Sequence, residues 1–245
     1  MEIKGLAFLP FVFFFWSIGG LTTSYILTVI SGHFKSYLMN ISYTGNYYPE
    51  RIALSTSLIV SALLDALIKY LMYRLQNLRL KDAERSYPKI HKACLLLGLI
   101  ASVGKVLVGG FPVTYYPLPH MIGKGLAFGG SILHNICNSI LLYKTSLISW
   151  RMFSVKAAIN GSAIVIILIY TVCRAVYVNS CTTTQCQQFD DIAAIIAEWI
   201  SASLVIAYPV TNFQLLQGLC FKIKWSLKED WLTLRENLQD TEAVP

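Results

Sequence analysis

Charged side chains are scarce in this 245-residue sequence. They make up 13% of the residues, whereas soluble domains carry about 25%. Hydrophobic residues make up 55%. This composition excludes an ordinary soluble domain and is typical of an integral membrane protein.

Motifs of catalysis, metal binding and phosphate binding are also missing. The sequence contains no HExxH, no paired CxxC, no GxSxG and no phosphate-cradling glycine-rich loop, and its four histidines are scattered. These absences disfavour an enzyme and predict no cofactor or metal. A membrane enzyme that draws its residues from several loops would leave no such motif, so the class stays open. No repeat or Pro/Gly/Ser-rich linker divides the chain, which predicts one membrane domain at 1–216 and a tail at 217–245.

Six long apolar runs fill most of the sequence. A helix rises about 1.5 Å per residue, so roughly 20 apolar residues cross the hydrocarbon core of a bilayer. The first run is longer than the apolar core of a signal peptide and is predicted to be a retained anchor. The sequence therefore predicts an all-α integral membrane protein, a bundle of six transmembrane helices, at about 6–30, 52–73, 93–111, 121–143, 157–178 and 192–216.

Positive charge is distributed unevenly over the connections between these runs. Of the 20 lysines and arginines, 14 lie in the two terminal segments and in the second and fourth connections, and 3 lie in the other connections. Cytoplasmic loops carry the excess of positive charge, so both termini are predicted to be cytoplasmic. This topology accounts for the net charge of +7, and no nucleic-acid partner is needed to explain it.

Three modification sites are candidates under this topology. Asn40 begins a glycosylation sequon in a predicted lumenal loop, and Cys181 and Cys186 lie in another, where oxidising conditions permit a disulfide. Cys220 follows the last span beside two lysines, a setting suited to palmitoylation or equally to a free thiol.

The predicted cytoplasmic side offers two surfaces for partners. The 74–92 loop is basic, and the tail has an apolar stripe at helical spacing that suits an amphipathic helix lying on the membrane surface. We expect membrane lipids, and cytoplasmic proteins bound through this loop and the tail, as partners.

Several charged side chains lie inside the predicted spans, where charge is costly and often marks function. Asp65 and Lys69 are four residues apart on one helix face, which fits either a functional group or a self-neutralising pair. Lys105, Arg174 and Glu198 lie toward the lumenal ends of three spans. They are candidates for a buried ion-pair cluster, unless Lys105 and Arg174 extend to lipid headgroups.

Span four contains further polar and small residues. His134 stands with Asn135 and Asn138, which favours either a proton relay or hydrogen bonds between helices. Gly125 and Gly129 form a GxxxG pattern, which predicts close packing of another helix against this stretch.

Two blocks of sequence resemble a known family. LAFLPFVFFFWSIGGLTTSYILTVISGHF, followed by ISYTGNYYPER, is similar to the damage-regulated autophagy modulator (DRAM) family, which also embraces GPI-anchor remodelling factors and plasma-membrane phosphoinositide regulators. IAAIIAEWISASLVIAYPVTNFQ resembles the last span of that family, with its Glu-Trp pair at Glu198 and Trp199. Tyr43 stands where the autophagy branch has Asp. The loop motif of the family is carried here by Ile41, Ser42, Thr44, Gly45, Pro49 and Glu50.

The resemblance implies a non-catalytic endomembrane protein, often lysosomal, that modulates autophagy. One alternative is a lipid-handling factor for GPI-anchored proteins or a phosphoinositide regulator, at the Golgi or the plasma membrane. Another is a transporter, which requires Asp65, Lys105, His134 and Glu198 to line one polar cavity. The motif loop is expected either to cap the bundle or to recognise headgroups or partners.

Overall fold

The computed structural model describes residues 2–3, 6–33, 38–79, 88–180, 192–217 and 221–222, and most side chains within them. Six helical segments are long and apolar enough to cross a membrane, which confirms the predicted all-α bundle of six spans. The first five spans consist of η1 (Leu6–Phe8) with α1 (Leu9–Ile30), α2 (Glu50–Arg79), α3 (Pro88–Gly110), α4 (Pro117–Gly125) with η3 (Leu126–Gly130) and α5 (Ser131–Lys144), and α6 (Trp150–Ser180). The sixth consists of α7 (Ile192–Ala207), η5 (Tyr208–Asn212) and α8 (Phe213–Gln217), and a short helix η2 (Ile41–Gly45) lies between spans one and two.

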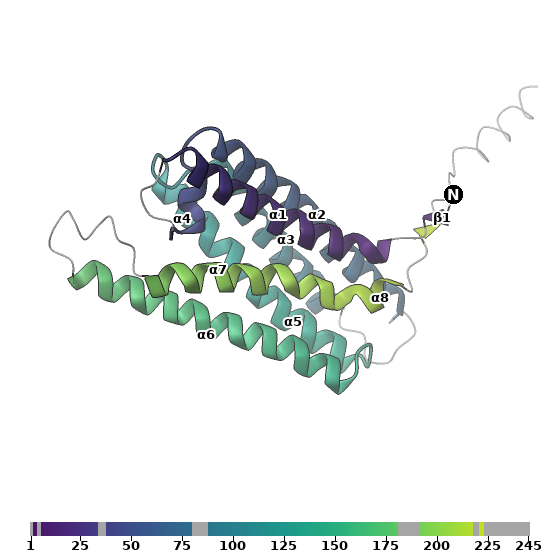
Figure 1. Cartoon of the computed structure of the whole chain (residues 1–245). Coiled ribbons are helices and arrows are strands. Elements are labelled where there is room, and N and C mark those ends of the chain that lie inside the picture. The colour runs from purple at the N-terminus through teal and green to yellow at the C-terminus, as the bar shows by residue number, and fades with distance from the viewer. Residues whose placement is uncertain are drawn as a thin grey trace, which may run out of the picture.

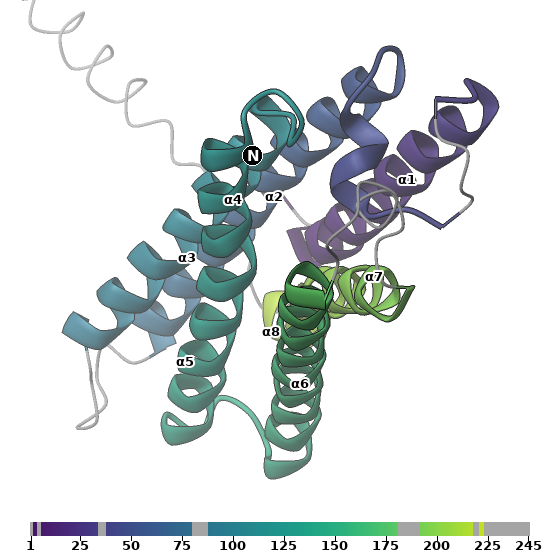
Figure 2. The ribbon, with the colours of Figure 1, turned by 90° about the vertical axis from the view of Figure 1, so that its left-hand side faces the viewer.

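The helices form two groups around a shared interior, one of α1 to α5 and one of α6 and α7. α2 packs on both α1 and α3, α3 also packs on α4, η3 and α5, and α6 pairs with α7 (Figure 1). Figure 2 shows the same bundle from the end where η2 lies, with α3 to α5 on one side and α6 and α7 on the other. We call residues 38–50 the signature loop. The end of the bundle where this loop lies, together with residues 111–117, is called the signature-loop end. Charged residues from different spans meet in this interior, both between α2 and α3 and between α4 and α7.

The two ends of the chain approach each other at the opposite end of the bundle. A two-residue strand β1 (Glu2–Ile3) pairs antiparallel with β2 (Phe221–Lys222) (Figure 1). The segments that flank the first and last spans therefore lie on one side, as an even number of crossings requires.

The surface and the interior have the reverse of the usual soluble pattern. Large apolar side chains face outward, among them Phe15 at 67% exposure and Leu118 at 70%. Asp65, Lys69 and Glu198 are buried. An apolar exterior around a partly polar interior is favourable only when lipid surrounds the protein.

Span four is longer at its start than predicted and packs through different glycines. Pro117 begins α4, where a residue without an N–H donor is well tolerated. Gly125 and Gly129 have open space where a Cβ would be, so the predicted close packing at the GxxxG pattern is wrong. The close approach of α3 and α4 occurs instead at Gly104 and Gly123, because their missing side chains let the two backbones meet.

This packing yields a matched test with two glycine substitutions. Gly104→Ala would place a Cβ 2.5 Å from the backbone nitrogen of Ala127, so the helices must separate and we expect a loss of about 1–3 kcal/mol. Gly129→Ala meets no neighbour and should be neutral or slightly stabilising. Thermal unfolding of both variants in detergent checks this expectation. Equal melting temperatures for the two would contradict the described contact.

Candidate functional site

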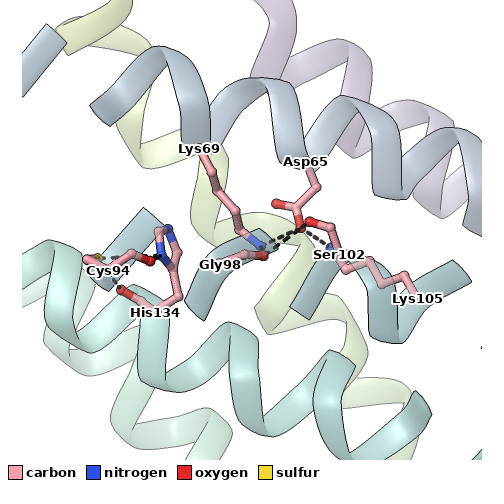
Figure 3. Close-up of polar contacts among 7 residues, drawn as sticks. All are labelled: Asp65, Lys69, Cys94, Gly98, Ser102, Lys105 and His134. Atoms are coloured by element: carbon pink, nitrogen blue, oxygen red, sulfur yellow. Dashed lines mark hydrogen bonds and ion pairs between the residues drawn. The ribbon is translucent and has the colours of Figure 1, made fainter. Parts of the chain in front are cut away.

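A charged cluster lies near the middle of the bundle, centred on Asp65 of α2. Its Oδ2 atom accepts hydrogen bonds from Lys69 Nζ at 2.6 Å, Lys105 Nζ at 2.7 Å and Ser102 Oγ at 3.1 Å (Figure 3). The Lys105 ammonium also lies 5.0 Å from the ring centre of Phe13. Two lysines therefore share one carboxylate, and this Asp65 cluster holds α2 against α3 with one excess positive charge.

The space around Lys69 depends on a glycine. Lys69 Nζ donates a second hydrogen bond to the carbonyl oxygen of Gly98, at 2.9 Å (Figure 3). A Cβ on Gly98 would lie 2.8 Å from the Lys69 side chain and 2.7 Å from the His134 ring. Gly98 thus allows the lysine and the histidine to lie against the same turn of α3.

The polar residues of span four make hydrogen bonds to other helices. His134 Nδ1 donates to the carbonyl oxygen of Cys94 at 2.8 Å, an orientation visible in Figure 3. Gln76 Nε2 donates to Asn138 Oδ1 at 2.7 Å, and the Tyr208 hydroxyl donates to the carbonyl oxygen of Asn135 at 2.9 Å. These contacts are hydrogen bonds between helices, which is one of the two roles predicted for these residues. None of the three contacts links His134 to Asp65, as a proton relay between the two would require.

A second charged cluster lies toward the signature-loop end, on α7. Glu198 Oε1 accepts from Lys124 Nζ at 2.8 Å, and Lys124 donates also to the Tyr170 hydroxyl at 2.8 Å. The expected grouping of Glu198 with Lys105 is therefore wrong, because Lys105 is bound to Asp65. The side chain of Arg174 lies outside the described residues. We call Lys124, Tyr170 and Glu198 the Glu198 cluster.

Two lysines near the ends of predicted spans are inside the bundle. Lys124 is one of them. The other, Lys156, is fully buried in α6, where its Nζ donates to Thr211 Oγ1 at 2.6 Å and Asn212 Oδ1 at 2.7 Å. Lys124 lies within the predicted span 121–143, whereas Lys156 lies one residue before the predicted span 157–178, because that apolar run begins after the charged residue. The available signal was a lysine within one helical turn of the end of an apolar run, in a chain whose other spans contain an acid or amides that could pair with it.

The signature loop is tied to α1 through Thr44. The Thr44 carbonyl oxygen accepts from Ser24 Oγ at 2.5 Å and from Thr28 Oγ1 at 3.2 Å, while its own hydroxyl donates to Ile41 O at 2.8 Å. Gly45 packs against Leu54 so closely that a Cβ would lie 2.4 Å from a methyl carbon. These bonds hold η2 against α1 and α2.

Other residues of the loop reach α4 and α7. Ser42 Oγ lies 3.0 Å from His120 Nε2 and 3.4 Å from Glu198 Oε1. The indole N–H of Trp199 donates to Met39 O at 3.0 Å. Ser42 and Glu198 are 156 residues apart in the sequence. The loop motif and the Glu-Trp pair are thus neighbours in space.

The remaining motif residues complete this end. Glu50 is fully buried at the start of α2 and contacts His33 Nδ1 through Oε1, at 2.6 Å. The peptide bond between Tyr48 and Pro49 is cis. Asn40 is only 5% exposed, and because a glycan needs solvent around the asparagine amide, the folded conformation disfavours the predicted modification.

Some predicted sites lie outside the described residues. They are Cys181, Cys186, Cys220, the middle of the 74–92 loop at 80–87, and the tail beyond 222. The disulfide, palmitoylation and amphipathic-helix predictions remain predictions.

A cavity of about 90 Å³ lies between the two charged clusters. Lys105 of the first cluster and Lys124 and Glu198 of the second are among its lining residues. Asp65 and His134 are not among its lining residues, so the single polar cavity that the transporter alternative requires is not formed by the described side chains. The site combines two lysines, a glutamate and several serines around a small space inside the bundle.

The unequal charges of the Asp65 cluster predict unequal effects of two substitutions. Asp65→Asn leaves two buried ammonium groups without a counter-charge and should cost about 3–5 kcal/mol. Lys69→Met leaves Asp65 and Lys105 as a balanced pair, so its cost should be clearly smaller. Unfolding of both purified variants in detergent gives the comparison. A loss from Lys69→Met as large as that from Asp65→Asn would show that charge balance does not govern this cluster.

The sequence is similar to a family of membrane proteins over most of its length. Residues 5–214 match the family model described as the Frag1/DRAM/Sfk1/Cwh43P N-terminal domain. DNA damage-regulated autophagy modulator protein 1 of Mus musculus is 27% identical over 235 residues, which cover 94% of this chain and 98% of the relative. The human protein of the same name is 26% identical over 93% of this chain and 98% of its own length.

A further relative matches over a shorter stretch. DNA damage-regulated autophagy modulator protein 2 of Bos taurus is 32% identical over 141 residues, or 58% of this chain and 53% of the relative. No solved structure matches. Since the family model spans the six membrane helices and the signature loop, the chain belongs to the Frag1/DRAM/Sfk1/Cwh43 N-terminal domain family.

Proposed function

We propose that this chain is a non-catalytic, multispanning protein of the endomembrane system, resident in lysosomes, that modulates autophagy. The observation that carries the proposal is the extent of the similarity to autophagy modulator protein 1, which spans nearly the whole of both chains. The motif loop and the Glu-Trp pair, which underlie the resemblance, are in direct contact. The proposed role therefore rests on the whole bundle and on this assembled end.

In this proposal the two ends of the bundle have different tasks. The signature-loop end, predicted to be lumenal, is a packed cap, since Thr44, Gly45 and Glu50 are buried. The opposite end, predicted to be cytoplasmic, presents the basic segment 74–92, whose ends belong to α2 and α3, and the tail to lipids and protein partners. The bundle thus anchors and orients cytoplasmic contacts at the membrane.

Deletion of the gene and complementation test the proposal. Cells without the protein should show altered autophagic flux under starvation, measured as lysosomal turnover of a lipidated autophagosome marker, and the wild-type chain should restore it. A tagged chain expressed at the native level should lie with lysosomal membrane markers. Unchanged flux together with a non-lysosomal location would overturn the proposal.

Two loop substitutions separate capping from recognition. Tyr48 is 64% exposed, whereas Gly45 is buried against Leu54. If the loop is a cap, Gly45→Val should destabilise the fold and retain the protein in the endoplasmic reticulum, because the added side chain displaces Leu54. Tyr48→Ala should then keep both location and flux. Normal location with lost flux in Tyr48→Ala would instead indicate that the loop binds a partner.

A lipid-handling role for GPI-anchored proteins is a second candidate. One observation favours it: His120, Ser42 and Glu198 come together beside the cavity, where a polar headgroup could be bound. In the same deletion cells this role predicts changed surface retention of GPI-anchored proteins with unchanged autophagic flux.

A further inference from the structure

The cavity between the charged clusters is built from five of the six spans and the signature loop. Its lining residues come from α1, η2, α2, α3, α4, η3 and α7, and most of them are apolar, including Leu21, Phe128 and Ile206. A single water needs only about 10–15 Å³ of such space, so the cavity of about 90 Å³ holds more than one water-sized group. It offers both polar and apolar surface to a ligand.

Polar groups at the cavity have hydrogen-bonding capacity that the described residues leave unused. Glu198 Oε2 and Ser57 Oγ are buried and have no hydrogen-bond partner within the described part of the chain, although both residues are at most 3% exposed. Lys105 donates to Asp65, and an ammonium group carries three donors. Buried unsatisfied polar atoms are costly and rare, so their presence around one space points to something that binds there.

The two charged clusters that border the cavity also carry unequal numbers of positive and negative charges. The Asp65 and Glu198 clusters together contain three lysines, Lys69, Lys105 and Lys124, and two carboxylates. Net charge inside a membrane bundle is unfavourable unless a counter-charge is near. A ligand with one negative charge would neutralise the group.

We propose that this cavity binds a monoanionic lysophospholipid. Its phosphate would accept hydrogen bonds from Lys105, Lys124 and the unpartnered Ser57 Oγ. A free glycerol hydroxyl would donate to Glu198 Oε2, and the start of its acyl chain would contact the apolar wall. An inorganic anion would leave the wall and Glu198 unused. A neutral lipid would leave the positive charge uncompensated. The proposal is independent of the autophagy role, because binding is measured on the isolated protein.

The test uses the purified full chain in nanodiscs of neutral phospholipid and a lysophosphatidylglycerol with a photoreactive group near the start of its acyl chain. Crosslinks should map by mass spectrometry to the cavity wall, for example to Phe128 or Val205, and unlabelled lysophosphatidylglycerol should abolish them. A monoacylglycerol of the same chain length and glycerol 3-phosphate should each compete about tenfold less well or worse, because each lacks one half of the ligand. Equal competition by either compound, or crosslinks spread over the outer surface, would overturn the proposal.

A pair of alanine substitutions tests the location. Ala202→Leu fills part of the cavity and should reduce crosslinking about tenfold, whereas Ala158→Leu makes the same change on the exposed face of α6 and should have no effect. Unchanged labelling of a folded Ala202→Leu protein would place the ligand elsewhere. If Ala202→Leu fails to fold, Ser57→Ala decides: it removes a hydroxyl without a described partner, so the fold should persist, and labelling should fall severalfold. Full labelling of Ser57→Ala would count against the site.

Discussion

The structure depends on one constraint: each charge inside the bundle needs a counter-charge or hydrogen bonds from another span. Asp65 receives two ammonium groups and a hydroxyl, Glu198 receives Lys124, and Lys156 is bound by Thr211 and Asn212. Since lipid supplies no water to these groups, a misplaced helix would leave charge unpaired at a cost of several kcal/mol. The polar contacts therefore select one arrangement of helices whose apolar surfaces alone would pack in many ways.

The same constraint explains the polar residues of the signature loop. Thr44 binds α1 through its backbone carbonyl, Ser42 reaches His120 and Glu198, and Met39 accepts from Trp199. A loop with polar side chains is required here because it joins the ends of helices whose polar groups face one another. The family resemblance and the packing thus rest on the same residues.

Small residues set how closely the spans approach the polar groups. Gly98 leaves room for Lys69 and His134, and Gly104 with Gly123 brings α4 against α3. The GxxxG pattern of span four was a poor guide because spacing identifies a small-residue face but not whether that face meets a helix or lipid. Only the tertiary arrangement shows that Gly125 and Gly129 are directed away from a neighbour.

The number of spans and the helical class followed from the sequence, because length and apolar composition are local properties that a bilayer converts directly into helices. The pairing of Asp65 with Lys69 was accessible for the same reason, since four residues make one helical turn. The partners of Glu198, Lys105 and Lys156 could not be predicted from the sequence. Each partner lies 40 or more residues away on another helix, and no local pattern encodes which helix faces pack together. The cavity and its charge imbalance likewise exist only once α1, α3 and α7 are placed together, and that placement was decided by the tertiary structure.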